Sequence, residues 1–232
     1  VVVNDIGVGL DGSPAGGGSA AQGVVDEIRS AGGEAVVSGA DVSDWEQAAA
    51  LIQTATDAFG GLHVLVNNAG IVRDRMIANT SEAEFDAVIA VHLKGHFATM
   101  RHAGAYWRGL SKAGDHVDAR IINTSSGAGL QGSVGQGNYS AAKAGIAALT
   151  LVAAAEMGRY GVTVNAIAPS ARTRMTETVF ADMMAKPESG FDAMAPENIS
   201  PLVVWLGSAE SADVTGRVFE VEGGIIRAAE GW

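Results

Sequence analysis

The chain has 232 residues, of which 47% are hydrophobic and 18% are charged, and its formal net charge is −11. One α/β domain can reach this length and bury a large core, and the composition argues against disorder. The acidic balance and the lack of a Lys/Arg cluster disfavour nucleic acid and anionic membrane surfaces as partners. The chain has no cysteine, which excludes disulfides and thiol catalysis. Of the five histidines, His92 and His96 are four residues apart and would share a helix face, but no third ligand accompanies them, so we expect no metal.

No apolar stretch is expected to span a membrane, and the sequence shows no signal peptide, although a chain that begins inside a strand could have lost one. We therefore expect a cytoplasmic protein that acts on a small molecule.

Strands and helices are predicted to alternate, which is typical of a parallel sheet covered by helices. Strands are predicted over residues 1–3, 34–38, 62–66, 120–123, 162–167 and 217–221. Helices are predicted over about 20–31, from a cap at Ser43 or Asp44 to 59, over about 80–110, and from about 138 to 158 or 161, with two more before the last strand. No repeat or linker marks a second domain.

The opening strand runs into Gly7-x-Gly9-x-x-Gly12, the spacing of a phosphate-binding loop. Such a loop works only where a helix begins at its last glycine, because the helix N-terminus holds the phosphate charge. Here a Ser/Pro/Gly-rich stretch follows, and helical periodicity begins only near Ala20. The spacing alone therefore does not establish a phosphate site.

One constellation carries chemistry: Ser126, Tyr139 and Lys143. Tyr139 and Lys143 are four residues apart, so a helix projects both from one face. A lysine ammonium beside a phenol favours the phenolate, and we expect Lys143 to lower the Tyr139 pKa. A tyrosine so tuned can exchange a proton with an alcohol or carbonyl, whose oxygen Ser126 can hold. The alternative is a surface Tyr and Lys on an ordinary helix; Ser126 on a strand end and the residues 136–138 before the tyrosine disfavour it.

The stretch NTSSGAGLQGSVGQGNYSAAKAGI resembles the active-site segment of the short-chain dehydrogenases/reductases, which implies catalytic roles for Ser126, Tyr139 and Lys143. Further segments match this family: Asp41-Val42, the NNAG turn at 67–70, the VNAIAP strand at 164–169 and the TxM motif at 173–175. The resemblance implies a single Rossmann-like domain over 1–232, a doubly wound parallel sheet in three αβα layers. It also implies a cofactor site formed by Asp5, Asp41, Val42, Asn68, Ala69, Gly70, Tyr139, Lys143, Pro169 and Thr173.

In this family the Asp-Val pair follows the third strand and NNAG the fourth, which makes VVVND the second strand. Asp5 then stands where an acid binds both adenosine ribose hydroxyls and repels a 2′-phosphate. The resemblance further implies that the GxGxxG run is an insertion, and that the family's first strand and TGxxxGxG loop are missing, as in an N-terminally truncated domain. We expect a gap in the sheet between Val1–Val3 and Leu62–Val66.

Two positions depart from the family pattern. His92 stands where the family usually has an Asn that supports a proton-relay water, and Ser170 replaces a Gly after Pro169. His92 is interpreted either as a catalytic proton carrier or as a packed helix residue. Together with the segments APSARTRMTETV and GRVFEVEGG, it makes the chain most similar to the (3R)-hydroxyacyl-CoA dehydrogenase domains of peroxisomal multifunctional enzymes and their hydroxysteroid dehydrogenase-like relatives.

The resemblance implies an NAD-dependent oxidoreductase that interconverts a secondary alcohol and a ketone, with a 3-hydroxyacyl-CoA or a hydroxysteroid as substrate. An apolar segment, 172–195, is expected to cover the substrate. Two alternatives remain: an NADPH-dependent 3-oxoacyl reductase, and a non-catalytic scaffold that binds the cofactor. Family members usually associate through two long helices, here about 83–110 and 138–158, which implies a homodimer or homotetramer.

Overall fold

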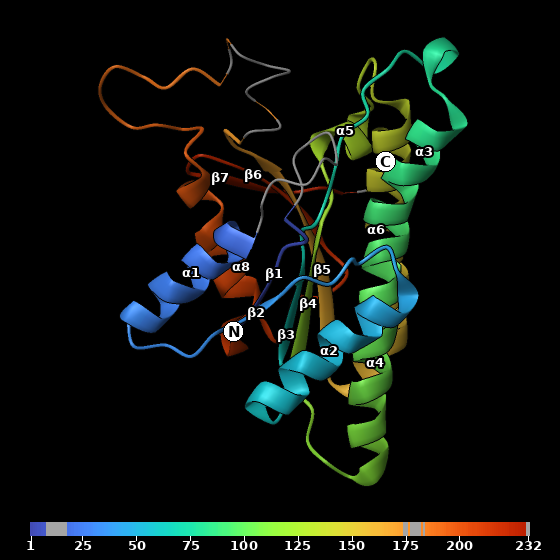
Figure 1. The fold of residues 1–232 in the computed structure, drawn as a ribbon, viewed down its shortest axis with the longest axis vertical. Coiled ribbons are helices and arrows are strands. Elements are labelled where there is room, and N and C mark those ends of the chain that lie inside the picture. Colours follow the sequence, from blue (N-terminus) through green and yellow to red (C-terminus); the bar gives the residue numbers. More distant parts are fainter. Residues whose placement is uncertain (8–17, 174–175, 177–181, 183, 231–232) are drawn as a thin grey trace.

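The computed structural model describes residues 1–7, 18–173, 176, 182 and 184–230, and it has three layers. A central sheet is covered on one face by α1 (Gly18–Ser30) and α8 (Ser200–Leu206). The other face carries α2 (Trp45–Phe59), α4 (Gly95–Ala113) and α6 (Gly137–Met157) (Figure 1). This arrangement confirms the predicted Rossmann-like αβα architecture.

The strands fall into two groups. β1 (Val2–Asn4) pairs in parallel with β2 (Val36–Ser38), as expected for the family's second and third strands. A five-stranded sheet has the order β3-β4-β5-β6-β7, in which only the last pair is antiparallel. Its strands are β3 (Val64–Asn67), β4 (Ala119–Thr124), β5 (Val162–Ser170), β6 (Val218–Glu222) and β7 (Ile225–Ala228). The sequence did not predict β7.

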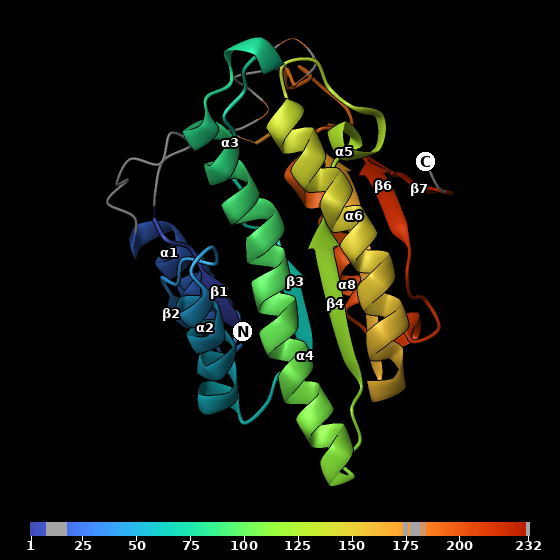
Figure 2. The same cartoon turned by 90° about the vertical axis from the view of Figure 1, so that its right-hand side faces the viewer.

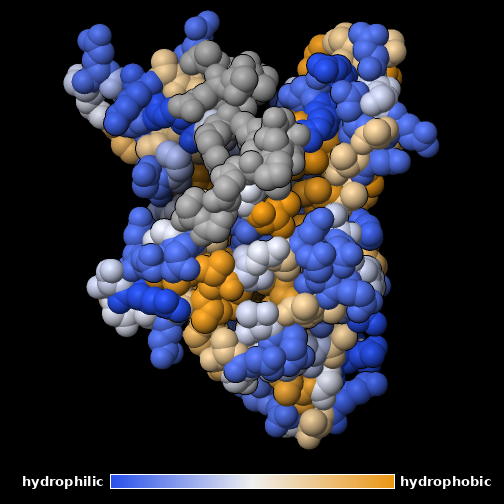
Figure 3. All heavy atoms as spheres, in the orientation of Figure 1, coloured by the Kyte–Doolittle hydropathy of each residue, from blue (hydrophilic) through white to orange (hydrophobic). Residues whose placement is uncertain are grey.

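The gap expected between the opening strand and the strand at Leu62–Val66 is present. Among the described residues no strand lies between β1 and β3, and the two sheets share no ladder. A cavity of about 890 Å³ separates them and is lined by both strands. Val64 and Val66 on β3 are 38% and 45% exposed, unusual for a parallel sheet, which is normally buried on both faces. Figure 3 shows apolar side chains in this groove between the α1 side and the α2 side.

The helix predicted over about 80–110 is not continuous. It consists of α3 (Glu82–Ile89), a π-helical segment (Ala90–Lys94) and α4, preceded by a 3₁₀ turn at Ile77–Asn79 (Figure 2). Ser81 and Glu84 form a reciprocal capping box at the start of α3, as the sequence predicted. A π segment adds a residue to one turn and so re-aims the side chains within it. Here it directs His92 into the protein, where the side chain is 1% exposed.

Two elements next to α6 differ from the sequence prediction. A short helix, α5 (Gly127–Gln131), follows β4 and had no sequence signal. β5 was expected to end at Ile167, before Ala168-Pro169, but it continues to Ser170, and Pro169 pairs with Val221 of β6. The remaining short elements are 3₁₀ turns at Gly158–Tyr160, Pro196–Asn198 and Ala209–Ser211. Pro169 is tolerated in β5 because it lies near the end of the strand, where fewer ladder hydrogen bonds depend on the N–H that proline lacks.

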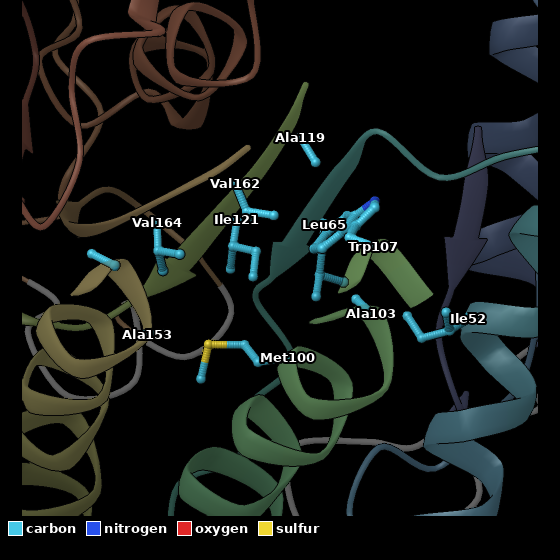
Figure 4. Close-up of a cluster of buried hydrophobic side chains, with 11 residues drawn as sticks. Ile52, Leu65, Met100, Ala103, Trp107, Ala119, Ile121, Ala153, Val162 and Val164 are labelled. Atoms are coloured by element: carbon cyan, nitrogen blue, oxygen red, sulfur yellow. The ribbon is translucent and has the colours of Figure 1, made fainter. Parts of the chain in front are cut away.

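The largest cluster of buried apolar side chains lies between the sheet and its α2, α4 and α6 layer (Figure 4). Trp107 of α4 is 1% exposed, and its indole N–H donates to the Leu62 carbonyl oxygen at 2.7 Å. A second cluster joins β4, β5 and β6 to α8. Both faces of the central strands β4 and β5 are therefore packed against helices, which fixes the position of their carboxyl ends.

The expectation that no stretch is long and apolar enough to cross a membrane is wrong for α6. Together with the 3₁₀ turn that follows it, α6 passes that test by length and composition, with 39% of its most apolar window buried. The helix packs against β5 and β4, so its apolar character is that of a core helix with one face left open.

Candidate active site

The three side chains predicted to be catalytic meet at the carboxyl end of β4. Ser126 follows this strand and caps α5, accepting a hydrogen bond from the Ala128 N–H at 3.2 Å. Tyr139 and Lys143 lie one turn apart on α6, and the Lys143 Nζ lies 5.5 Å from the centroid of the Tyr139 ring. The Ser126 side chain interacts with the Tyr139 hydroxyl and lowers its pKa. The sequence prediction that these three residues form one site is consistent with this geometry.

Close packing of α5 on α6 holds this arrangement. A Cβ at Gly129 would lie 2.7 Å from the Lys143 carbonyl carbon, so only glycine permits the contact. The Ser125 hydroxyl donates to the Lys143 carbonyl oxygen at 2.9 Å, and the Lys143 Nζ donates to the Thr124 carbonyl oxygen at 2.6 Å. Lys143 is thus tied at both its backbone and its side chain to the end of β4.

The electrostatics differ from the prediction that Lys143 lowers the Tyr139 pKa. Burial raises the pKa of Tyr139, and the negative charge of Asp74 raises it further, whereas the hydrogen bond to Ser126 lowers it. Burial also lowers the pKa of Lys143 to about 7. The predicted direction is therefore wrong for this structure, because the site is dry enough to disfavour both the phenolate and the ammonium.

His92 is placed by the π segment beside both the catalytic tyrosine and the NNAG turn. Its ring meets the Tyr139 ring edge-on, with centroids 5.2 Å apart. The Nε2 atom lies 2.7 Å from the carbonyl oxygen and 3.1 Å from the amide nitrogen of Ile71, and a neutral ring can satisfy only one of them at a time. Burial, followed by the nearby Lys143 charge, lowers the pKa of His92 to about 3. At neutral pH His92 therefore acts by hydrogen bonding and packing and carries no positive charge.

The predicted adenosine-binding residues line the cavity between the two sheets. Asp5 follows β1, is exposed, and its carboxylate accepts a hydrogen bond from the Gly7 N–H at 2.7 Å. Asp41 follows β2, and its carboxylate accepts from both the N–H and the hydroxyl of Ser43. Val42 packs against Gly95 of α4, where a Cβ would lie 2.9 Å from the valine methyl group.

The NNAG turn forms the neighbouring wall at the end of β3. Asn68 and Ala69 are exposed, and the Asn68 amide oxygen accepts a hydrogen bond from the Thr124 hydroxyl at 3.1 Å. Gly70 lies against the His92 ring, because a Cβ there would come within 2.4 Å of it. On the far side, Pro169 lies in β5 and Thr173 is exposed. The rest of the GxGxxG run, Gly9 to Gly12, lies outside the described residues.

These positions fit a dinucleotide. In open α/β sheets, ligands bind outside the carboxyl ends of the strands, and all of these residues follow or end strands at that edge. The carboxylates of the exposed Asp5 and the half-buried Asp41 offer acceptors to hydroxyl groups, while Ala69 and Gly70 leave room for a flat ring system.

The comparisons with known proteins decide the family. A model of the family described as short chain dehydrogenase matches residues 15–184. The chain belongs to the short-chain dehydrogenase family. It is similar to the hydroxyacyl-CoA dehydrogenase ChsB1 of Mycobacterium tuberculosis, with 49% identity over 229 residues, which cover 96% of this chain and 69% of that protein. A crystal structure of a short chain dehydrogenase from Mycobacterium avium is 84% identical, with a TM-score of 0.88, and the match covers all of this chain and 77% of that one.

A further relative supports the branch predicted from the sequence. The peroxisomal hydratase-dehydrogenase-epimerase of Saccharomyces cerevisiae is 45% identical over 225 residues, 97% of this chain but 23% of that protein. The short-chain dehydrogenase described here is thus an oxidoreductase of the hydroxyacyl-CoA dehydrogenase-like branch, which binds a nicotinamide cofactor and acts on a small molecule.

A buried hydrogen-bond network in this short-chain dehydrogenase was not predicted from the sequence. The Thr99 hydroxyl donates to the Asn67 amide oxygen at 2.7 Å, and the Asn67 amide nitrogen donates to Asn123 at 3.0 Å. The Asn123 amide nitrogen in turn donates to the Thr150 hydroxyl at 2.9 Å. The available signal was a polar residue inside an otherwise apolar strand, Ile121-Ile122-Asn123, which must find a partner when buried.

A second missed feature lies on the segment expected to cover the substrate. Arg172 forms an ion pair with Asp192 and donates to the Met184 carbonyl oxygen at 3.0 Å. Its own N–H donates to the Met194 carbonyl oxygen at 2.7 Å. Of the apolar residues predicted there, Met184 is buried and Phe191 is 69% exposed. Met175, Val179, Phe180 and Met183 lie outside the described residues.

His92 gives a test of the two interpretations that the sequence left open. Replacement by Asn supplies a donor and an acceptor for Ile71, so we expect His92→Asn to keep turnover within roughly tenfold, about 1.4 kcal/mol in activation free energy, with an unchanged pH profile. His92→Leu removes both hydrogen-bonding possibilities, and its melting temperature should fall below that of His92→Asn. Steady-state rates of both variants across pH measure the turnover and its pH profile, and thermal unfolding measures their melting temperatures. Loss of one limb of the pH profile in His92→Asn would show that the imidazole carries a proton.

Proposed function

We propose that this short-chain dehydrogenase is NAD-dependent and oxidises the hydroxyl of a 3-hydroxyacyl-CoA, with a hydroxysteroid as the second candidate substrate. The observation that carries the proposal is the convergence of Ser126, Tyr139 and Lys143 at the end of β4, where the Ser126 and Tyr139 side chains interact. Such a pair of hydroxyls can hold one substrate oxygen from two directions, which suits proton transfer at that atom.

The proposed mechanism assigns one task to each side chain. Ser126 and Tyr139 hold the substrate hydroxyl, and Tyr139, as the phenolate, takes its proton. The bound nicotinamide supplies the hydride acceptor for this chemistry. Lys143 has its pKa lowered to about 7 by burial, so hydroxyl acceptors from a bound ribose would favour its charged form and, in turn, the Tyr139 phenolate.

The substrate class rests on the printed names of the relatives and on the apolar character of the covering segment. The relatives are named a hydroxyacyl-CoA dehydrogenase and a peroxisomal hydratase-dehydrogenase-epimerase. Met184 and Met194 support that assignment, because methionine side chains are flexible and apolar and can adapt to an acyl chain or a steroid. No cluster of basic residues identifies a site for the CoA phosphates, so this part of the proposal rests on the relatives.

Asp5 separates the proposal from its nearest rival, an NADPH-dependent 3-oxoacyl reductase. A carboxylate at the end of β1 accepts hydrogen bonds from ribose hydroxyls but repels a 2′-phosphate. The other rival, a scaffold without catalysis, gives no reason for Ser126, Tyr139 and Lys143 to converge.

Tyr139→Phe tests catalysis. We expect this variant to lose at least ~1000-fold in turnover, within the usual contribution of a positioned acid–base group, while its NAD affinity stays within a few-fold. Lys143→Ala should lose both activity and affinity, because it is expected to serve both. Single-turnover rates and calorimetric titration with NAD measure the two effects. Activity of Tyr139→Phe within tenfold of the wild type would contradict the assignment.

Asp5→Ala tests cofactor choice. The wild type should prefer NAD over NADP by at least ~10-fold in kcat/KM, about 1.4 kcal/mol, and the variant should narrow that ratio by improving NADP. Asp26→Ala, on the exposed surface of α1, is the matched control and should leave the ratio unchanged. A wild-type preference for NADP would favour the reductase alternative.

We further propose that the open face of α4 and α6 forms a subunit interface (Figure 2). Phe97, Leu151 and Val152 are 45%, 44% and 52% exposed there, beside a surface hollow of about 590 Å³ between the two helices. Apolar side chains exposed together at such a face are typical of an interface between subunits.

We therefore expect a dimer or tetramer by light scattering at micromolar concentration. Val152→Glu should give a smaller species, because it places a charge in the interface. Val204→Glu, on α8 at the opposite face of the sheet and 70% exposed, should leave the assembly unchanged. A monomeric wild type would rule the interface out.

A further inference from the structure

The residues around Asp74 form a strap across the N-terminal turn of the catalytic helix. The Arg75 N–H donates to the Gly135 carbonyl oxygen at 2.8 Å, and the Asn138 amide donates to the Arg73 carbonyl oxygen at 3.1 Å. Gly137 lies against Ile77, where a Cβ would come within 3.0 Å. The strap, residues 73–77, therefore packs directly on the turn that precedes Tyr139.

Asp74 is the side chain that links this strap to the buried Gln136. Its Oδ2 accepts a hydrogen bond from the Gln136 amide at 2.9 Å, and Gln136 is 8% exposed. Its Oδ1 is also buried and has no hydrogen-bond partner within the described part of the chain. A buried carboxylate with one oxygen unpaired costs stability unless it serves another purpose. Of the residues 136–138 that precede the tyrosine in the sequence, Gln136 thus binds this carboxylate, and the other two contact its neighbours in the strap.

The charged and titratable groups facing Tyr139 come from three elements. Lys143 approaches the ring from α6, and His92 meets its edge from the π segment. Asp74 reaches the turn before Tyr139 from the strap, through its hydrogen bond to Gln136. Its negative charge raises the pKa of the phenol, whereas the Ser126 side chain lowers it. Asp74 is thus the one negative charge identified as acting on Tyr139 in the described residues.

We propose that Asp74 is a positioning residue which, through its hydrogen bond to Gln136, fixes the turn that carries Tyr139 and holds a negative charge at that turn. The inference rests on the proposed role of Tyr139 as the acid–base group. In the direction of ketone reduction the Tyr139 hydroxyl must give a proton. A nearby anion favours the protonated form of the tyrosine, and therefore favours this direction at neutral pH. In the direction of alcohol oxidation the same anion delays the rise of activity with pH.

Asp74→Asn removes the charge but keeps an oxygen that can accept from Gln136. The oxidation rate of the wild type and of the variant is measured across pH with saturating NAD and a 3-hydroxyacyl-CoA. We expect the pH midpoint of this rate to be lower in the variant by roughly 0.5–1 unit. This is the effect of one charge several ångströms away in a partly buried site. Below the midpoint, oxidation should therefore be about 3- to 10-fold faster than in the wild type.

Asp74→Glu keeps the charge and should retain the wild-type midpoint, and Asp86→Asn, an exposed aspartate on α3, should have no effect. Ultraviolet titration of tyrosinate gives a second readout that needs no turnover. The chain has three tyrosines, so subtracting the titration of Tyr139→Phe isolates the signal of Tyr139. This signal should shift down in Asp74→Asn by the same amount as the midpoint of the rate.

An unchanged tyrosinate titration in Asp74→Asn, or equal shifts in Asp74→Asn and Asp74→Glu, would overturn the proposal. Asp74→Ser replaces Asp74→Asn if melting curves show that the latter does not fold, and failure of both to fold would assign Asp74 a structural role instead. Full activity of Tyr139→Phe would contradict the proposed function, whereas a missing shift in a fully active Asp74→Asn contradicts only this inference.

Discussion

The buried amide pair of Asn67 and Asn123 is the constraint on which the site depends. The two residues are register partners on β3 and β4, and their side chains hydrogen-bond to each other as well. Thr99 extends the chain of bonds to α4 and Thr150 extends it to α6. Unpaired amides in a dry core are costly, so this network permits one relative position of two strands and two helices. The NNAG turn, Ser126 and the catalytic helix all follow from that position.

Dehydration of the site governs its electrostatics. Burial moves the pKa values of Tyr139, Lys143 and His92 in the direction that favours the neutral form of each group. A charged group can still act in such a site, provided that a ligand supplies the hydrogen bonds that the protein does not. The Lys143 ammonium donates one hydrogen bond within the protein, to the Thr124 carbonyl oxygen, and has further donors for a ligand. In the proposed mechanism, activation of the tyrosine would thereby depend on a bound ribose.

The gap between β1 and β3 shows which contacts hold the opening strand in place without a neighbour on that side. β1 pairs with β2, and the Asn4 side chain forms two hydrogen bonds with the backbone of Ala40. These bonds keep Asp5 and Asp41 beside each other at the carboxyl ends of the two strands. The residues predicted to bind adenosine therefore follow β1 and β2, while the residues proposed to be catalytic lie at the other sheet.

The sequence by itself determined the alternation of strands and helices, the parallel character of the sheet and the grouping of Ser126, Tyr139 and Lys143. These features depend on local spacing and on motifs, which are properties of neighbouring residues. Only the tertiary structure decided the π segment that buries His92, the continuation of β5 through Pro169 and the opposition of Asp74 to Gln136. It also reversed the expected direction of the Tyr139 pKa shift. Each of these depends on how far water is excluded and on which distant segments pack together, and neither quantity is written in the spacing of residues along the chain.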